Sequence, residues 1–188
     1  MFLLNMLKTK MRKISFNIAT LSLIWMAFAF LPQEKLAWKI DKKYSVNFSS
    51  KSVGGVFNSF KGEVFFDQQN LNAASFKLTI DPTSVNTGNA MQNGHIQQKD
   101  WLDSKQYPSI DFVSSYFVKE RDSFIVLGDL TLHGVKKTVK IPFTYSEEKK
   151  KAKVQAIFSF NRFDYRVGNP KDGVDSVLTI NVVMPLKK

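Results

Sequence analysis

The sequence predicts an all-β antiparallel fold, and two observations support this prediction. Apolar and polar residues alternate with a period of two in segments from Tyr44 to Met184, which indicates strands with one buried face. Short turn signals such as His133-Gly134 separate most segments, and short links favour antiparallel neighbours. The 188 residues include no cysteine, so packing alone must hold the fold. Such strands form either a barrel or a sandwich, and periodicity alone does not decide between them.

Eight segments carry the alternation. We expect strands close to residues 44–48, 64–67, 75–80, 110–118, 124–131, 135–145, 152–160 and 178–184. Turn signals at Gly54-Gly55 and at the Glu/Lys run 147–151 separate strands. Pro142 near a strand centre predicts a bulge or an edge position, because proline cannot donate a ladder hydrogen bond.

The segment 81–108, after the third strand, breaks this alternation. It is too long for a hairpin turn, and its part 89–99 predicts about three helical turns, which Gly94 opposes. A connection of this length is typical of one that carries function or covers an opening. We therefore expect a long loop with a short helix there.

The N-terminus has the order of a secretory signal. A basic cluster made of Lys8, Lys10, Arg12 and Lys13 precedes an almost wholly apolar run at 14–31. Small residues in Ala27-Phe28-Ala29 predict cleavage after Ala29, and an uncleaved anchor helix is the alternative, since the run is at the lower limit for a bilayer span. Either reading predicts export of the remainder, to the periplasm or medium. The expected organisation is a signal at 1–29, a linker at 30–37 and one domain at 38–188.

Composition argues against a catalyst. Only His95 and His133 are present, which makes a multi-histidine metal centre improbable, and the motifs of phosphate loops, zinc proteases, dinucleotide folds and serine hydrolases do not occur. We therefore expect no catalytic residues, no metal and no cofactor. A lipid-ester hydrolase is the weaker alternative.

Charge suggests the kind of partner. The formal net charge is +11, and four basic residues leave with the signal, so the mature chain carries about +7. For an exported protein this favours anionic lipid headgroups or phosphates over nucleic acid, with a solvated basic surface as the alternative. The sequence leaves the oligomeric state open, and a homodimer with it.

Seven strings occur in an order that resembles the YceI-like family. They are WKID at 38–41, FKGEVFFD at 60–67, SVNTG at 84–88, GHIQQKDWLDSKQYPSIDF at 94–112, GDLTLHGVKKTV at 128–139, FSFNRFDYRVG at 158–168 and VLTINVVM at 177–184. The resemblance implies an eight-stranded lipocalin-like antiparallel barrel in the bacterial periplasm that holds a polyisoprenoid chain. The chain departs from the family at Tyr44, where many relatives have histidine, and at Gln92 and Asn93, where many have arginine and aspartate. Of these loop positions, only His95 carries over.

An eight-stranded barrel encloses one elongated apolar ligand or is filled by its own side chains. The alternation, read with the resemblance, assigns the following residues to an apolar tail: Val46, Phe48, Val64, Phe66, Phe76, Leu78, Phe112, Tyr116, Phe143, Phe158, Phe160, Leu178 and Ile180. Ordinary core packing is their alternative role.

A mouth or headgroup site would take other residues. His95 and Trp101 lie in the long loop, where an amphipathic indole suits a boundary, although capping alone is equally consistent with the sequence. Arg162 and Arg166 could bind phosphate through planar forks, or pair structurally with Asp164 or Asp175. His133 is expected at the surface of a turn.

The expected function is therefore storage or transport of a polyisoprenoid, an isoprenoid quinone or a similar prenyl lipid. The main alternative is a non-enzymatic interaction module with a filled barrel and a basic surface.

Overall fold

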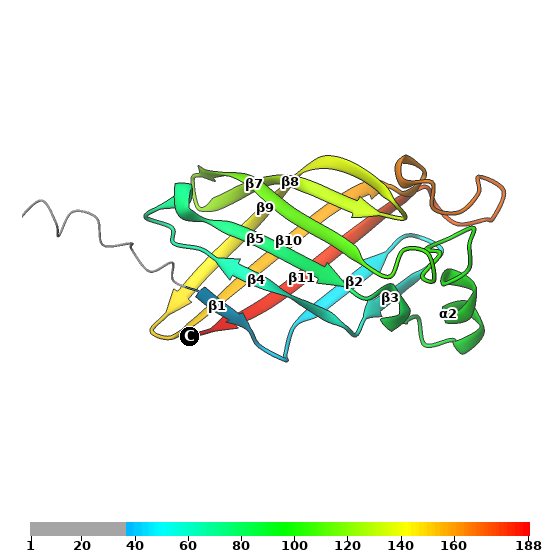
Figure 1. Ribbon diagram of the computed structural model, residues 1–188, viewed down its shortest axis with the longest axis horizontal. Helices are drawn as coiled ribbons and strands as arrows, with labels where there is room; N and C mark the ends of the chain where they lie inside the picture. The colour runs from blue at the N-terminus through cyan, green and yellow to red at the C-terminus, as the bar shows by residue number, and fades with distance from the viewer. Residues whose placement is uncertain (1–36) are drawn as a thin grey trace, which may run out of the picture. The chain divides into compact units, whose positions relative to one another are not determined.

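The computed structural model describes residues 37–188, which form an antiparallel sheet that closes on itself (Figure 1). The signal expected at 1–29 lies outside the described residues, and Ala37, assigned to the linker, begins the first strand. The strands are β1 (Ala37–Ile40), β2 (Ser45–Ser49), β3 (Gly54–Phe57), β4 (Phe60–Phe65), β5 (Ser75–Ile80), β6 (Val85–Asn86), β7 (Ile110–Glu120), β8 (Ser123–Leu132), β9 (Val135–Glu148), β10 (Lys151–Asn161) and β11 (Val177–Lys187).

Closure depends on β1, which pairs with β4 on one side and with β11 on the other. Within the described residues the closed ring contains eight antiparallel strands in the order β1-β4-β5-β7-β8-β9-β10-β11. Beyond the ring, β2 pairs with β11, β3 with β2, and β6 with β3, so these short strands extend the wall at one end. The eight-stranded barrel is confirmed over the sandwich.

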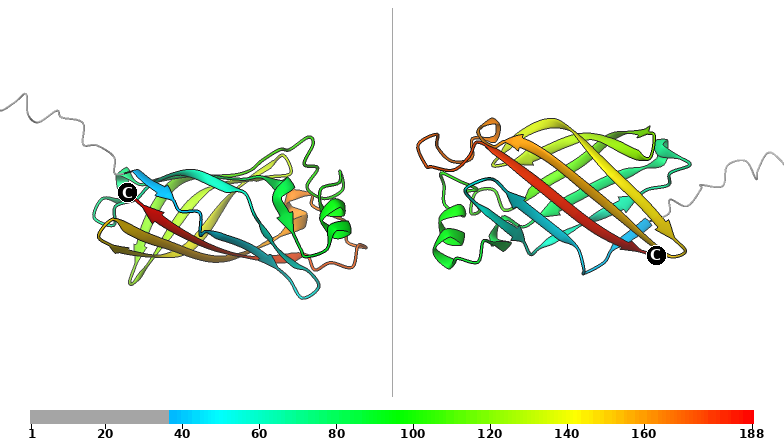
Figure 2. Two further views of the ribbon diagram at one scale, coloured as in Figure 1. Left: turned by 90° about the horizontal axis from the view of Figure 1, so that it is seen from below. Right: turned by 180° about the vertical axis from the view of Figure 1, so that it is seen from behind.

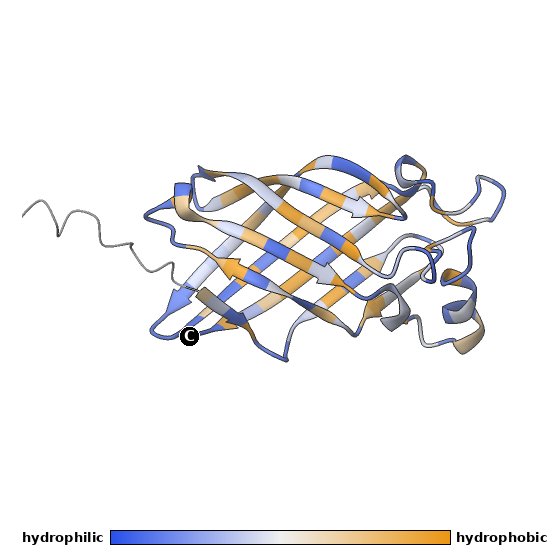
Figure 3. Ribbon diagram, viewed as in Figure 1, coloured by the Kyte–Doolittle hydropathy of each residue, from blue (hydrophilic) through white to orange (hydrophobic). Residues whose placement is uncertain are grey.

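Buried and exposed residues alternate along the strands as the sequence predicts, and Figure 3 shows the matching alternation of hydrophobic and hydrophilic residues. On β10, for example, Val154 and Ala156 are buried while Gln155 between them is exposed. Burial of a side chain the size of valine contributes about 1.5–3 kcal/mol relative to exposure. The barrel interior is therefore the hydrophobic core.

Two of the predicted turns are confirmed and one is wrong. Turns join β8 to β9 at His133-Gly134 and β9 to β10 at Lys149-Lys150. Gly54-Gly55, however, lies within β3. A Cβ on Gly55 would come within 2.7 Å of the Phe48 ring, so this glycine allows a ring to pack against a strand rather than forming a turn.

β7 contains a bulge between Ser114 and Tyr116 that reverses its alternation. Tyr116 is 58% exposed on the outer face, whereas Phe117 is buried. The expectation that Tyr116 faces an apolar ligand is therefore wrong, because parity does not carry across a bulge.

Pro142, expected at a bulge or an edge position, pairs with Ile125 of β8 without a register shift and lies next to the end of the β9–β10 ladder. The pairing of β9 with β10 ends at Phe143 and Ala156, while the pairing of β9 with β8 continues to Val135. Between Val135 and Pro142, β9 is not paired with β10. There the 3₁₀-helix η3 (Arg162–Tyr165) contacts β9 through Asp164, whose Oδ1 lies 3.5 Å from Lys137 Nζ.

The long connection contains a shorter helix than expected. α2 spans Ala90–Ile96, and the Asn89 side chain caps it by accepting the Gln92 N–H. The chain then folds back, with Leu102 N–H donating to the Ile96 carbonyl over 3.0 Å. No helix among residues 37–188 is long and apolar enough to cross a membrane.

Candidate functional site

The end of the barrel near α2 is hollow. Figures 1 and 2 show α2 and the loop after η3 at this end, and the C-terminus at the other. A cavity of about 330 Å³ opens here, between the barrel wall and the side chains of Ile96, Trp101 and Leu102 from the long connection. A second cavity of about 100 Å³ lies deeper. The two adjoin, because they share Val46, Ile80, Ile110, Leu130, Phe158 and Ile180.

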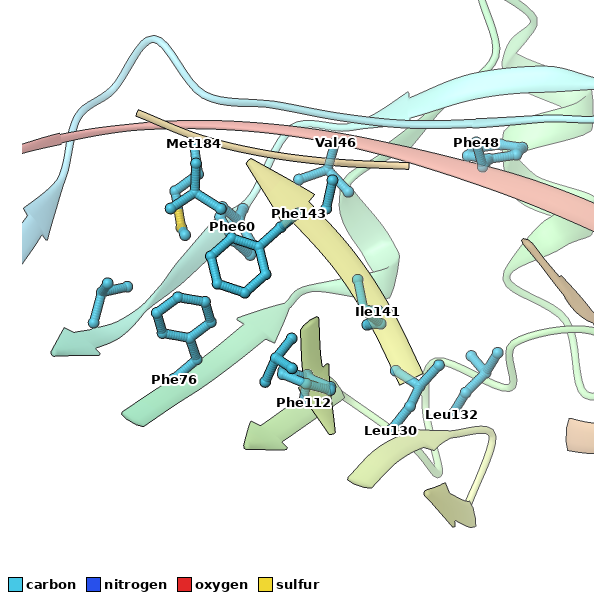
Figure 4. Packing of buried hydrophobic residues seen from close by; sticks show 14 of the residues in the cluster. Val46, Phe48, Phe60, Phe76, Phe112, Leu130, Leu132, Ile141, Phe143 and Met184 are labelled. Atoms are coloured by element: carbon cyan, nitrogen blue, oxygen red, sulfur yellow. The ribbon is translucent and has the colours of Figure 1, made fainter. Parts of the chain in front are cut away.

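The other end of the barrel is filled by aromatic rings. The Phe66 ring lies 4.7–5.9 Å, centroid to centroid, from five other rings. We call this group the aromatic plug; it comprises Phe66, Phe76, Phe117, Phe124, Phe143 and Tyr145. Phe76 and Phe143 also line the deeper cavity, together with Phe60 and Met184, and Figure 4 shows these four side chains close together. The cavity therefore ends at the plug.

Ten of the residues assigned to the apolar tail line these cavities: Val46, Phe48, Phe76, Leu78, Phe112, Phe143, Phe158, Phe160, Leu178 and Ile180. Phe158, Phe160 and Ile180 point inward yet are only half-buried, because they face open space. Val64 and Phe66 are buried at the closed end and line neither cavity.

Sequence reasoning missed the contribution of β8. Val126, Leu130 and Leu132 line the cavities, but this strand carries four consecutive apolar residues from Phe124, which hide its alternation. The pairing of β8 with β7, whose inward face includes Phe112, would have identified them.

His95 and Trp101 both line the mouth, as predicted from their place in the long loop. Their ring centroids are 5.7 Å apart in an edge-to-face arrangement, and Gln92 lies beside them in the lining. His133, expected at the surface, is instead half-buried, with Nδ1 3.3 Å from the Tyr165 carbonyl oxygen. Both imidazoles therefore contact groups other than a serine hydroxyl. No cluster of three or more metal-ligating side chains occurs within residues 37–188.

Arg162 is completely buried beside the mouth, and its fork holds the loop that follows. Nη2 donates to Asp172 Oδ1 over 2.7 Å and to the Val174 carbonyl over 2.8 Å, and Nη1 donates to the Val167 carbonyl over 2.8 Å. The guanidinium carbon also lies 5.0 Å from the centre of the Trp101 ring. The partner is Asp172 rather than the expected Asp164 or the Asp175 carboxylate.

This arrangement corrects two headgroup assignments. Sequence reasoning gave the forks of Arg162 and Arg166 to a phosphate, but the hydrogen bonds of Arg162 are directed at its own loop. Arg166 is exposed, caps η3 in a left-handed conformation and does not line the cavity.

The ion pair of Arg162 is reflected in the acidity of its partner. Burial alone would raise the pKa of Asp172, but backbone N–H groups of Asn169 and Val174 and the Arg162 guanidinium outweigh it and hold that pKa below the usual range. Asp172 is therefore ionised at neutral pH and fixes one side of the mouth.

Tyr44 joins two segments of the barrel wall through its hydroxyl. Its hydroxyl donates to the Asn58 carbonyl over 2.7 Å and accepts the Phe60 N–H over 3.1 Å. The phenol thus joins the residue before β2 to the start of β4, at a place where the β1–β4 ladder has already ended at Trp38 and Val64.

Comparisons with known proteins agree with this geometry. The profile of the YceI-like domain family matches residues 38–185. The protein YceI of Escherichia coli O17:K52:H18 is 37% identical over 112 residues, which cover 55% of this chain and 59% of that protein. The chain thus spans less than two thirds of such curated relatives.

Two solved structures share the fold. That of BcnA from Burkholderia cenocepacia aligns with a TM-score of 0.71 at 28% identity, covering 78% of this chain and 98% of BcnA. A polyisoprenoid binding domain from Saccharophagus degradans, implicated in plant cell wall breakdown, aligns with a TM-score of 0.64 at 18% identity, covering 81% and 99%. With its profile match, its closed barrel and its apolar cavity, the chain belongs to the YceI-like domain family.

Proposed function

We propose that this protein binds a long apolar chain, a polyisoprenoid or a similar prenyl lipid such as an isoprenoid quinone, inside the open half of its barrel. The single observation that supports this most strongly is the apolar cavity of about 330 Å³, a size typical of small-molecule sites. The family, and the polyisoprenoid binding domain that shares the fold, point in the same direction.

The energetics are sufficient without a charged group. Moving hydrocarbon out of water contributes about 0.8 kcal/mol per methylene, so roughly 15 carbons supply about 12 kcal/mol. Immobilising the ligand costs at least about 4 kcal/mol, which leaves at most about 8 kcal/mol, a binding free energy that corresponds to micromolar affinity at best. The role proposed is storage or transport rather than catalysis.

The mouth offers polar groups for the head of such a lipid. His95 and Gln92 line it next to the indole of Trp101. Because the donors of Arg162 already bind its loop, we assign the head to His95 and Gln92 rather than to an arginine fork.

Lipid extraction tests the proposal directly. The protein is purified without detergent from a lipid-containing host, extracted with organic solvent and analysed by mass spectrometry, and a stoichiometric prenyl lipid is the expected result. Leu178→Trp fills the cavity of about 330 Å³ and should lower the lipid yield several-fold. Val177→Trp places the same ring on the outer face and should leave the yield unchanged. An empty extract, or equal yields from both variants, would contradict the proposal.

Export and membrane contact are further parts of the proposal. They rest on the N-terminal sequence pattern and on the positive net charge. Binding to anionic vesicles should weaken steeply as salt rises, and binding that is indifferent to salt would exclude this contact.

A further inference from the structure

The depth of the two adjoining cavities follows from the spacing of their lining residues, and three strands lead to the same value. The upper and lower lining residues are Leu132 and Val126 on β8, Phe160 and Val154 on β10, and Leu178 and Met184 on β11. Each pair is six residues apart, which is roughly 20 Å along a strand and 15 Å along the axis of a barrel tilted near 40°. An extended hydrocarbon advances roughly 1.3 Å per carbon, given carbon–carbon bonds near 1.5 Å. The depth therefore holds about 12 chain carbons.

The floor at this depth is packed from behind. The Phe76 and Phe143 rings are 5.7 Å apart, and each lies within 6 Å of the Phe66 ring in the plug. Met184 beside them is buried. Interiors packed in this way have no room for an added chain, so a ligand cannot pass the floor without displacing several rings.

We propose that this floor limits the length of apolar chain that the protein encloses to about 12 carbons, or about three isoprene units. Phe76, Phe143 and Met184 are the residues that determine this length. The proposal rests on the proposed function and adds the size of the ligand. A longer polyisoprenoid keeps its remaining carbons outside the cavity, at the mouth beside Trp101.

A series of straight-chain primary alcohols with about 8 to 18 carbons measures the limit. Each is titrated calorimetrically into the delipidated protein. Each added methylene that enters the cavity should lower Kd about fourfold, the factor that about 0.8 kcal/mol gives. The decrease should stop at about 12 carbons, because further carbons stay in water.

Ala156→Leu tests the floor without removing any packing. Ala156 lines the deeper cavity next to Phe143, its partner in the β9–β10 ladder, so a leucine there fills that cavity and should move the limit to a chain about three carbons shorter. Gln155→Leu adds the same side chain to the outer face of β10 and should leave the limit unchanged. Phe143→Leu should move the limit to longer chains, and if this variant does not fold, Ala156→Leu alone decides.

The outcomes separate this inference from the function on which it rests. If no alcohol of any length binds, the proposed function itself fails. If alcohols bind but Kd keeps falling to about 18 carbons, or if Ala156→Leu has the same limit as Gln155→Leu, only the floor is refuted.

Discussion

The two halves of the barrel use the same residue type for opposite purposes. At the closed end, Phe66 contacts five aromatic rings and is almost fully buried. At the open end, Phe158 and Phe160 contact each other at 6.5 Å and face the cavity. An inward-facing phenylalanine by itself therefore indicates neither a packed core nor a ligand site. The two halves differ in how completely other rings surround each phenylalanine: five rings surround Phe66, whereas the Phe160 ring lies beside those of Phe158 and Tyr165 and borders the cavity.

The largest expected effect is a difference in stability between the two halves. Phe66→Ala should lower the free energy of unfolding by about 4 kcal/mol, because it leaves a hole inside packed rings. Phe160→Ala should cost only about 1–2 kcal/mol, because its ring already borders open space. Denaturant titrations of both variants measure the difference. Equal losses would mean that the open half carries as much of the stability as the plug.

The next effect concerns the loop at the open end. Asp172→Ala should cost about 2–3 kcal/mol, because it leaves the buried guanidinium of Arg162 without its anionic partner. The loss should be confined to the open half, so amide hydrogen exchange should increase between Arg162 and Val174 and stay unchanged in the plug. Faster exchange at Phe66 as well would show that the halves unfold as one unit.

The same ion pair predicts that the free energy of unfolding decreases at low pH. Because the folded pKa of Asp172 lies below its unfolded value of about 3.9, its contribution is fully present above that value and is lost as pH falls through the folded pKa. Asp172→Asn should therefore flatten stability against pH below about pH 4. Asp175→Asn is the control: this half-buried carboxylate has its pKa lowered by hydrogen bonds, first from Ser52, and has no cationic partner within residues 37–188, so it should change the pH dependence less.

A smaller effect is expected where the wall is bridged. Tyr44→Phe removes a hydroxyl that pairs with the Asn58 carbonyl and the Phe60 N–H, and should cost about 1 kcal/mol. Exchange of the Phe60 amide should increase while the ring packing of residue 44 on Phe60 is kept. An unchanged rate at that amide would mean that the wall does not depend on this bridge.

The smallest effect has the opposite sign. Tyr165 Oη is buried and has no hydrogen-bond partner among residues 37–188, and burial, aided by Asp164, raises its pKa. Tyr165→Phe should therefore leave stability unchanged or raise it by up to about 1 kcal/mol, because the variant removes a buried polar atom. A loss of thermal stability would show that this hydroxyl is satisfied in solution.

The sequence predicted the strands and most of the cavity lining because alternation reports directly on which face is buried. Tyr116 was misplaced because a bulge changes parity through a single residue, and the effect appears only in the pairing with β8. Arg162 was misassigned because its carboxylate partner ten positions away is chosen by the path of the loop. The plug was not predicted as distinct from the cavity, since Phe66 and Phe158 look alike in a strand pattern.

The end of the β9–β10 ladder at Phe143 and Ala156 has a mechanical consequence for the hollow half. From that pair toward the closed end, backbone hydrogen bonds hold β9 to β10, so the width of the barrel is fixed there. Toward the open end, the chain after β10 contacts β9 through the Lys137–Asp164 ion pair, and it contacts the β8–β9 turn where His133 approaches the Tyr165 carbonyl. We therefore expect this seam to widen for a branched or bulky guest without breaking any bond of the β9–β10 ladder, whereas the proposed floor would limit the guest's length.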